Sequence, residues 1–281
     1  HARPAAVFAQ AAKGFASTIQ LHKQGDSANA KSLVAIMALQ TVHGDSVYLS
    51  AAGADADQAL KVLSELLASG CGETVAALPV EPSPAVASEQ AATDVLRGVC
   101  ASPGSAFGHV VQLNESALQI TEFAPHPAIE RDHLEQGLAE AAHALKTLCD
   151  NAPGKAQADI FKAHQELLQD PGLLEQAFGL IEQGKSAAFA WQSATQATST
   201  LFKGLGSHLL AERALDLEDV GQRVLKLMLG VQDHALELPD HAILIAEQLT
   251  PSQTASLDTR KVAGFATVGG GATSHVAILA R

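Results

Sequence analysis

The chain opens on His-Ala-Arg-Pro-Ala-Ala-Val-Phe-Ala-Gln-Ala, residues 1–11, and this stretch is built like the start of a helix. Pro4 fixes φ near its helical value and has no N–H to lose, so it suits a first helical turn. Apolar residues follow it at Ala5, Val7, Phe8 and Ala11. We therefore expect His1 to stand directly before a helix.

A histidine in this position suits phosphoryl transfer. The N–H groups of a first helical turn have no intrahelical partners, so they can hold a phosphoryl group on an adjacent imidazole. Arg3 adds a cation with planar donors. Neutral imidazole is a nucleophile near pH 7, and phosphoryl transfer asks the protein mainly for positioning and charge stabilisation. Any one of the twelve histidines alone would be read as a helix cap or a surface residue.

The opposite end of the chain changes that reading. It closes on Gly-Gly-Gly-Ala-Thr-Ser-His-Val-Ala-Ile-Leu-Ala-Arg, residues 269–281. The glycines let the backbone approach a ligand, and Thr273 and Ser274 supply hydroxyls before His275. The spacing does not give the G-x-G-x-x-G pattern of a dinucleotide site, and a Walker loop is absent as well. A histidine in a helix-start setting at each end predicts a phosphohistidine relay.

Four segments resemble proteins of the bacterial sugar phosphotransferase system. Residues 1–6 resemble the active-site segment of HPr, the histidine phosphocarrier, and the resemblance continues to Leu67. Residues 269–281 resemble the phosphohistidine signature of enzyme I. Residues 101–108 are similar to the opening of enzyme I, and residues 249–255 to a segment shortly before its histidine. The chain is thereby identified as a member of the multiphosphoryl transfer proteins, in which HPr is fused to enzyme I.

This resemblance implies a fold of α/β and α parts. Residues 1–72 would form a small HPr-like open-faced α/β sandwich whose first strand is missing. Residues 73–96, rich in proline and small residues, would form a linker. Residues 97–127 and 231–281 would form the phosphohistidine α/β domain of enzyme I, truncated at its C-terminus, with an HPr-binding helical bundle inserted at residues 128–230. The chain would then be a fragment, cut at both ends, of a longer protein.

The residue pattern agrees with a bundle in the middle of the chain. Hydrophobic residues make up 47% of the chain but aromatic ones only 4%, so we expect alanine-rich helices. From Ile129 on, apolar residues recur at spacings of four and three, typical of a bundle seam: Leu134, Leu138, Ala141, Leu145 and Leu148. His164 lies on the apolar side of the next helix, and we interpret it as a packing residue outside the active site.

Further elements are expected from shorter patterns. Helices are predicted after residue 55 or 57 up to Gly70, at residues 173–181, at 187–205, at 216–229 and from residue 251. Strands are predicted at residues 17–23, 46–50, 242–246 and 262–267.

The resemblance implies a phosphoenolpyruvate-protein phosphotransferase. Phosphate would pass from phosphoenolpyruvate to Nε2 of His275, then to Nδ1 of His1 or to a separate carrier, and on to a sugar-specific IIA protein of the fructose type. Phosphoenolpyruvate and Mg²⁺ would bind a C-terminal barrel outside this chain, which would itself bind no metal or cofactor. The groups expected to stabilise the phosphate are Thr273, Ser274 and Arg281 at the second histidine and the amides of Ala2 and Arg3 at the first.

Two further positions carry expectations from the resemblance. Ser32 matches the position at which some HPr proteins take a regulatory phosphate, although a serine at the start of a short helix is ordinarily an N-cap, which we favour. Arg213 lies in a stretch similar to one that contacts the carrier, although a surface arginine is usually solvated. Glu218 stands where many relatives have a basic residue.

Charge and cysteine content limit the partners. The net charge is −12, yet residues 1–70 contain five Lys/Arg and five Asp/Glu, so the acidic excess falls entirely in the remainder. A neutral carrier could be steered electrostatically onto an acidic partner, whereas nucleic-acid binding is disfavoured.

Three cysteines without metal-like spacing predict reduced thiols in a cytoplasmic protein. No apolar run approaches the roughly 20 residues of a membrane helix, so no direct membrane insertion is expected.

Three alternatives stay open. Pyruvate phosphate dikinase and phosphoenolpyruvate synthase share a related Thr-Ser-His loop, but the HPr-like segment argues against them. The chain could instead be a regulatory phosphocarrier or interaction protein whose phosphorylation state is read by partners. It could also be a fragment that is inactive without its phosphoenolpyruvate-binding domain.

Overall fold

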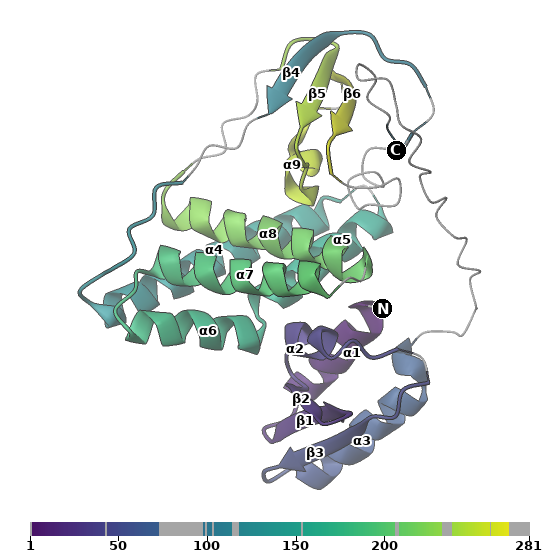
Figure 1. Cartoon of the computed structure of the whole chain (residues 1–281), viewed down its shortest axis with the longest axis vertical. Helices are drawn as coiled ribbons and strands as arrows, with labels where there is room; N and C mark the ends of the chain where they lie inside the picture. The colour runs from purple at the N-terminus through teal and green to yellow at the C-terminus, as the bar shows by residue number, and fades with distance from the viewer. Residues whose placement is uncertain are drawn as a thin grey trace.

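The structure, a computed structural model, describes residues 2–42, 44–72, 98, 100–102, 104–113, 118–152, 154–205, 208–231, 238–258 and 260–269. It contains three parts: a small α/β sandwich, a helical bundle and a parallel β-sheet. Figure 1 shows the sandwich below the bundle and the sheet above it. The predicted fold class, a small open-faced sandwich followed by an α/β unit with an inserted bundle, is confirmed. The predicted linker lies outside the described residues.

The sandwich places three helices on one face of an antiparallel sheet with strand order β2-β1-β3. Ile19 and Leu21 alternate inward along β1, and Phe8 of α1 and Leu63 of α3 pack against them. Its elements are α1 (Ala2–Lys13), β1 (Thr18–Lys23), β2 (Asp26–Asn29), α2 (Leu33–Ala38), β3 (Tyr48–Ala52), α3 (Ala56–Ala68) and the short turn η1 (Gly70–Gly72).

The sequence pattern missed β2 and misplaced β3. The residues of β2 are polar and show no alternation, but Gln24 and Gly25 both have positive φ, which forms the tight turn of a hairpin and pairs β2 with β1. The strand predicted at residues 46–50 begins at Tyr48, because Asp45 belongs to the preceding turn. There its carboxylate accepts from the Val42 N–H at 2.8 Å and pairs with Lys23 at 2.8 Å.

Asp55 precedes α3, yet its side chain does not cap that helix. Its carboxylate accepts hydrogen bonds from the Ser17 hydroxyl, from the Ser17 N–H at 2.8 Å and from the Ala16 N–H at 2.7 Å. These bonds, that of the Ser17 hydroxyl foremost, lower the pKa of Asp55 to about 2. The aspartate therefore holds the end of the loop after α1 rather than the helix that follows it.

The bundle consists of five helices among the described residues. Leu134, Ala141 and Leu145 of the predicted seam are fully buried, as is Trp191, whose indole N–H donates to the Gly221 carbonyl at 3.2 Å. The helices are α4 (Pro127–Asp150), α5 (Lys155–Leu168), α6 (Pro171–Glu182), α7 (Ala187–Gly204) and α8 (His208–Met228).

Two details of the bundle differ from the sequence prediction. The last helix begins at His208 rather than at Asp216, because apolar side chains at Leu210 and Ala214 extend its buried face towards the N-terminus. Bundle spacing within the helix predicted at residues 187–205 places Leu201 in the core, but it is 48% exposed, and its neighbour Phe202 fills the core instead.

The parallel sheet has strand order β4-β5-β6, with β4 at His109–Leu113, β5 at Ala242–Ala246 and β6 at Val262–Thr267. The short helix α9 (Pro251–Ser256) connects β5 to β6 and packs on α8. The patterns predicted β5, α9 and β6 but missed β4, in which only Val111 and Leu113 are half-buried and the adjacent Val110 and Val111 interrupt the alternation of apolar and polar residues. None of the described helices is long and apolar enough to cross a membrane.

Candidate functional site

The two predicted phosphohistidines, His1 and His275, lie outside the described residues, and so do Thr273, Ser274 and Arg281. The structure describes the residues that follow His1 and those that precede the segment of His275, as far as Gly269. Helix α1 begins at Ala2, so Ala2 and Arg3 occupy its first turn, where N–H groups have no intrahelical acceptor. The glycine stretch begins directly after β6 and Val268.

A single buried carboxylate joins the sandwich to the bundle. Asp170 is the N-cap of α6, and its Oδ1 accepts from the Gly172 N–H at 2.9 Å. The same carboxylate accepts from the Ser32 hydroxyl at 2.7 Å and from the Val34 N–H at 3.0 Å, both at the start of α2. Asp170 and Ser32 are both fully buried. One aspartate thus serves the N-termini of two helices that belong to different parts of the molecule.

A half-buried ionic contact lies beside it. Nζ of Lys13, in the last turn of α1, lies 3.1 Å from Oε2 of Glu166 on α5. The Gln10 amide, oriented with its nitrogen towards Glu166, donates to both carboxylate oxygens at 3.3 and 3.1 Å. The sandwich is therefore docked on the bundle by contacts from both α1 and α2, and α2 packs against α5, α6 and α7.

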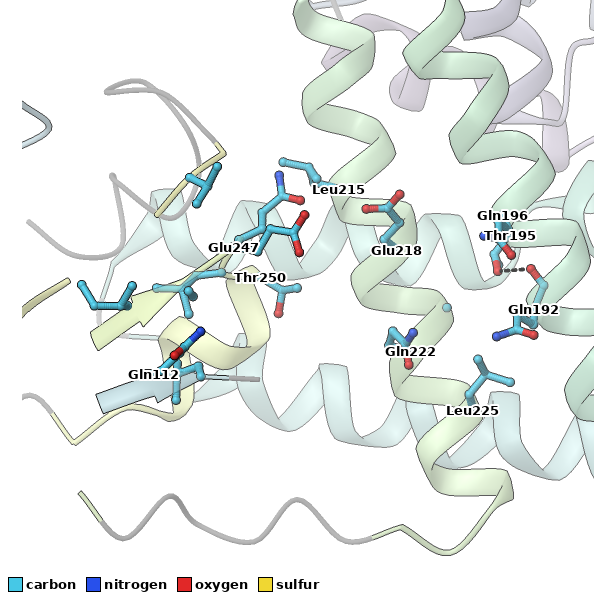
Figure 2. Close-up of a pocket in the computed structure, with 17 residues that line it drawn as sticks. Gln112, Gln192, Thr195, Gln196, Leu215, Glu218, Gln222, Leu225, Glu247 and Thr250 are labelled. Atoms are coloured by element: carbon cyan, nitrogen blue, oxygen red, sulfur yellow. Dashed lines mark hydrogen bonds between the residues drawn. The ribbon is translucent and has the colours of Figure 1, made fainter. Parts of the chain in front are cut away.

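A pocket of about 770 Å³ lies between the bundle and the parallel sheet. Its walls come from α7, α8, the carboxyl ends of β4 and β5 and the loop before α9, and Figure 2 shows Glu218 on the bundle side and Glu247 on the sheet side. Five glutamine side chains share the lining with apolar residues: Gln112, Gln192, Gln196, Gln222 and Gln248. Ligands of open α/β sheets bind at the carboxyl ends of the strands.

The glycine stretch starts beside this pocket. The N–H of Gly269 donates to the carbonyl of Glu247 at 2.9 Å, and Val268 lines the pocket. On the same side of the pocket, Thr250 caps α9 in a capping box with Gln253. The segment that carries the second predicted phosphohistidine thus departs from the rim of the pocket.

Three family models match the chain in succession. The PTS HPr component phosphorylation site matches residues 1–69, the N-terminal domain of PEP-utilising enzymes matches residues 97–213, and their mobile domain matches residues 238–281. The multiphosphoryl transfer protein of Rhodobacter capsulatus is 38% identical over 95% of this chain and 34% of its own length. That of Xanthomonas campestris is 37% identical over 100% of the chain and 35% of its own length. The chain belongs to the multiphosphoryl transfer protein family.

The chain spans about a third of the length of these multiphosphoryl transfer proteins. A third relative, the phosphoryl donor subunit DhaM of the PEP-dependent dihydroxyacetone kinase of Klebsiella michiganensis, is 30% identical over 100% of the chain and 57% of its own length. Among solved structures, the solution structure of Enzyme I (nEIt) matches with a TM-score of 0.51 and 33% identity, covering 66% of this chain and 79% of that one.

Ser32 is an N-cap, as the sequence favoured. Its hydroxyl accepts from the Ala35 N–H at 3.0 Å while it donates to Asp170. A Cβ added at Gly172 would lie 3.1 Å from this hydroxyl, so Gly172 lets α6 approach α2 closely. Phosphorylation of Ser32, expected for some HPr proteins, stays a prediction for this member of the family.

Arg213 and Glu218 both have partners inside the bundle. Nη1 of Arg213 donates to Asp216 at 2.6 Å, so its expected contact with a carrier stays a prediction. Glu218 accepts from the Ser199 hydroxyl at 2.6 Å and from Lys203 at 2.5 Å, so its charge is paired within the bundle.

The sequence reading missed three residues that hold the parts together: Glu166, Asp170 and Asp219. Asp219 is 5% exposed and lies on the buried side of α8, where it accepts from Ser252 at the start of α9. Acidic residues at buried positions of a helix were the available signal, because a charge is rarely buried without a partner. His164, interpreted as a packing residue, lies against this same carboxylate.

Proposed function

We propose that this chain relays phosphate between two of its own histidines, from His275 to His1, within a phosphoenolpyruvate-protein phosphotransferase of the phosphotransferase system. The docked sandwich carries the proposal. Its helix α1, which begins directly after His1, is held on the bundle through Lys13 and Glu166, and α2 through Asp170. Similarity to multiphosphoryl transfer proteins over the whole chain supports the same activity.

The chemistry consists of two transfers at phosphorus. The imidazole of His275 forms a P–N bond as the bond between phosphorus and the enol oxygen of phosphoenolpyruvate breaks, and its other nitrogen releases a proton to solvent. The enolate that leaves takes a proton from solvent at its methylene carbon and becomes pyruvate. The imidazole of His1 then takes the group as the P–N bond to His275 breaks, giving up its own proton while His275 regains one. The first-turn amides at Ala2 and Arg3 would stabilise the phosphate on His1, because their N–H groups are free to donate.

Phosphoenolpyruvate and Mg²⁺ would bind outside these residues, in a further domain of the whole protein. Among the residues that the structure describes, no group of three or more His, Cys, Asp or Glu side chains is arranged to hold a metal ion. In this proposal the residues of this chain bind, orient and exchange the phosphoryl group, and the metal would supply charge neutralisation at the phosphoenolpyruvate step.

We propose two candidate acceptors, the first from the resemblance of the sequence and the second from a relative. The first is a sugar-specific IIA protein of the fructose type, which receives the phosphate from His1. The second is a dihydroxyacetone kinase, favoured by the 30% identity to a DhaM subunit over 100% of the chain. We place the relay in the cytoplasm, in keeping with three cysteines that form no disulfide: Cys71, Cys100 and Cys149.

The test is a labelling experiment. The chain is incubated with a phosphorylated HPr donor, and acid-labile phosphate is mapped in the unchanged protein, in His275→Ala and in His1→Ala. A relay predicts label on both histidines of the unchanged protein, loss of label from His1 in His275→Ala, and label kept on His275 in His1→Ala. Label on His1 that persists in His275→Ala would contradict the relay. No label on a folded chain would mean that it is inactive without its phosphoenolpyruvate-binding domain, which contradicts the proposal.

The acceptor is decided by a second step. The labelled chain is mixed separately with a fructose-type IIA protein and with the dihydroxyacetone kinase subunits. Loss of label to one and not the other identifies the acceptor. If neither protein removes the label, and a partner binds the chain only when it is phosphorylated, the result would favour the regulatory phosphocarrier.

A further inference from the structure

His164 is a fully buried histidine between two carboxylates. It lies on α5 and faces α8, with Nε2 3.4 Å from Oδ1 of Asp216 and Nδ1 3.6 Å from Oδ2 of Asp219. Both distances are longer than an ordinary hydrogen bond, and neither ring nitrogen has a hydrogen-bond partner among the described residues. Small shifts between α5 and α8 would therefore complete or break these contacts.

The two carboxylates have different partners besides His164. Asp216 is paired with Arg213 one turn earlier on α8. Asp219 reaches out of the bundle: its Oδ2 accepts from the Ser252 N–H at 3.1 Å and from the Ser252 hydroxyl at 2.5 Å. Arg223 donates to the same hydroxyl at 2.5 Å. Asp219 is thus the point at which the bundle holds the start of α9.

The loop that leads into α9 forms part of the pocket. Thr250, the N-cap of that helix, lines the pocket opposite the bundle and precedes Ser252 by two residues. The glycine stretch leaves the same rim at Gly269. A change in the way that Asp219 holds Ser252 would therefore move one wall of the pocket relative to the other.

Helix α5 has a second contact on its other side. Glu166 follows His164 by two residues, about 200° around the helix, and binds Lys13 of the sandwich at 3.1 Å. One helix therefore touches the docked sandwich through Glu166 and the anchor of α9 through His164.

We propose that His164 is a positioning residue: through Asp219 it fixes α9, and with it the pocket wall beside the glycine stretch, relative to the helix that receives the sandwich. The consequence for phosphate transfer rests on the proposed function, whereas the anchoring of α9 does not. Nδ1 carries the effect, because it faces Asp219, and Nε2 faces a carboxylate that Arg213 already pairs.

Two amide substitutions separate these nitrogens. In His164→Asn the amide nitrogen stands close to the place of Nδ1, whereas in His164→Gln it stands close to the place of Nε2. His164→Leu removes both. His133→Asn is the matched control, since His133 also bonds to α8, at the Met228 carbonyl, 3.1 Å away, without facing Asp219.

Hydrogen exchange of the Ser252 amide is the readout, because that N–H donates to Asp219. We expect exchange about tenfold faster in the Leu and Gln variants and close to the unchanged protein in the Asn variant and the control. Equal exchange in Asn and Gln, or no change in Leu, would overturn the proposal, since a packing role depends on volume and not on the position of one nitrogen. If the Leu variant does not fold, the comparison of Asn with Gln decides alone.

Transfer of label between the two histidines is measured in the same variants. We expect label transfer to be slower in His164→Gln and close to the rate of the unchanged protein in His164→Asn. Absence of label in the unchanged chain would refute the proposed relay, while the exchange of Ser252 would still decide whether His164 anchors α9. Label transfer at equal rates in Gln and Asn, with a relay present, would contradict the consequence for catalysis.

Discussion

The bundle holds its two neighbours in different ways. Towards the sandwich it offers one buried carboxylate, Asp170, and one half-buried ion pair, and most of the donors belong to helix ends that water can also satisfy. Towards the parallel sheet it offers a buried cluster of three side chains, His164, Asp216 and Asp219, of which Asp219 accepts from the half-buried Ser252. Breaking the second contact would leave Asp219 and His164 with fewer partners in the interior, so we expect it to cost more than breaking the first, whose backbone and hydroxyl donors water can satisfy.

The largest expected effect comes from the buried cluster. Asp219→Ala removes the acceptor of Ser252 and a carboxylate that faces His164, so we expect the free energy of unfolding to fall by about 3 kcal/mol. Chemical denaturation measures it, with the exposed Asp132→Ala as control. The sandwich should stay docked, and its release in this variant would erase the distinction between the two contacts.

A somewhat smaller loss is expected at the other contact. Asp170→Ala removes the caps of two helices, which should cost about 2 kcal/mol. The NMR shifts of Val34 and its neighbours in α2 should move to those of an undocked sandwich, while amide exchange in β5 stays unchanged. Asp150→Ala, at the exposed end of α4, serves as control. Unchanged shifts in α2 would mean that Asp170 does not hold the sandwich.

The ion pair beside Asp170 should contribute less. Lys13→Met is expected to weaken docking by about 0.5–1 kcal/mol, with most of the loss disappearing at high salt, because the pair is partly exposed. A double-mutant cycle with Glu166→Gln measures the coupling. Coupling that is insensitive to salt would show that the pair behaves like the buried cluster.

The smallest expected effect is a loss of stability of the sandwich at low pH. The pKa of Asp55 is about 2 in the folded chain, below its ordinary value of 3.8, so its stabilising contribution is present above about pH 4 and is lost as the pH falls towards 2. The unfolding free energy of the sandwich should therefore decline over this range, and Asp55→Asn should flatten the decline. Asp57→Asn, on the exposed side of the same helix end, should leave it as it is.

Local signals in the sequence predicted much of the fold. Pro4 placed the start of α1, the spacing from Ile129 placed α4, and Ser32 was predicted as a cap. These features depend on neighbours within one or two turns, which a linear pattern contains. The strands β2 and β4 escaped because their residues show no alternation, and pairing with a neighbour is what makes them strands.

In the candidate site, too, some features follow from local sequence and others from tertiary packing. The sequence by itself determined that a histidine segment of HPr type and one of enzyme I type share one chain, because each motif is local and their order can be read directly. Only the tertiary structure decided that Asp170 caps a helix 136 residues away and that His164 lies between two carboxylates. A cap or an ion pair between distant residues depends on how the helices pack, and packing is a property of the folded chain as a whole.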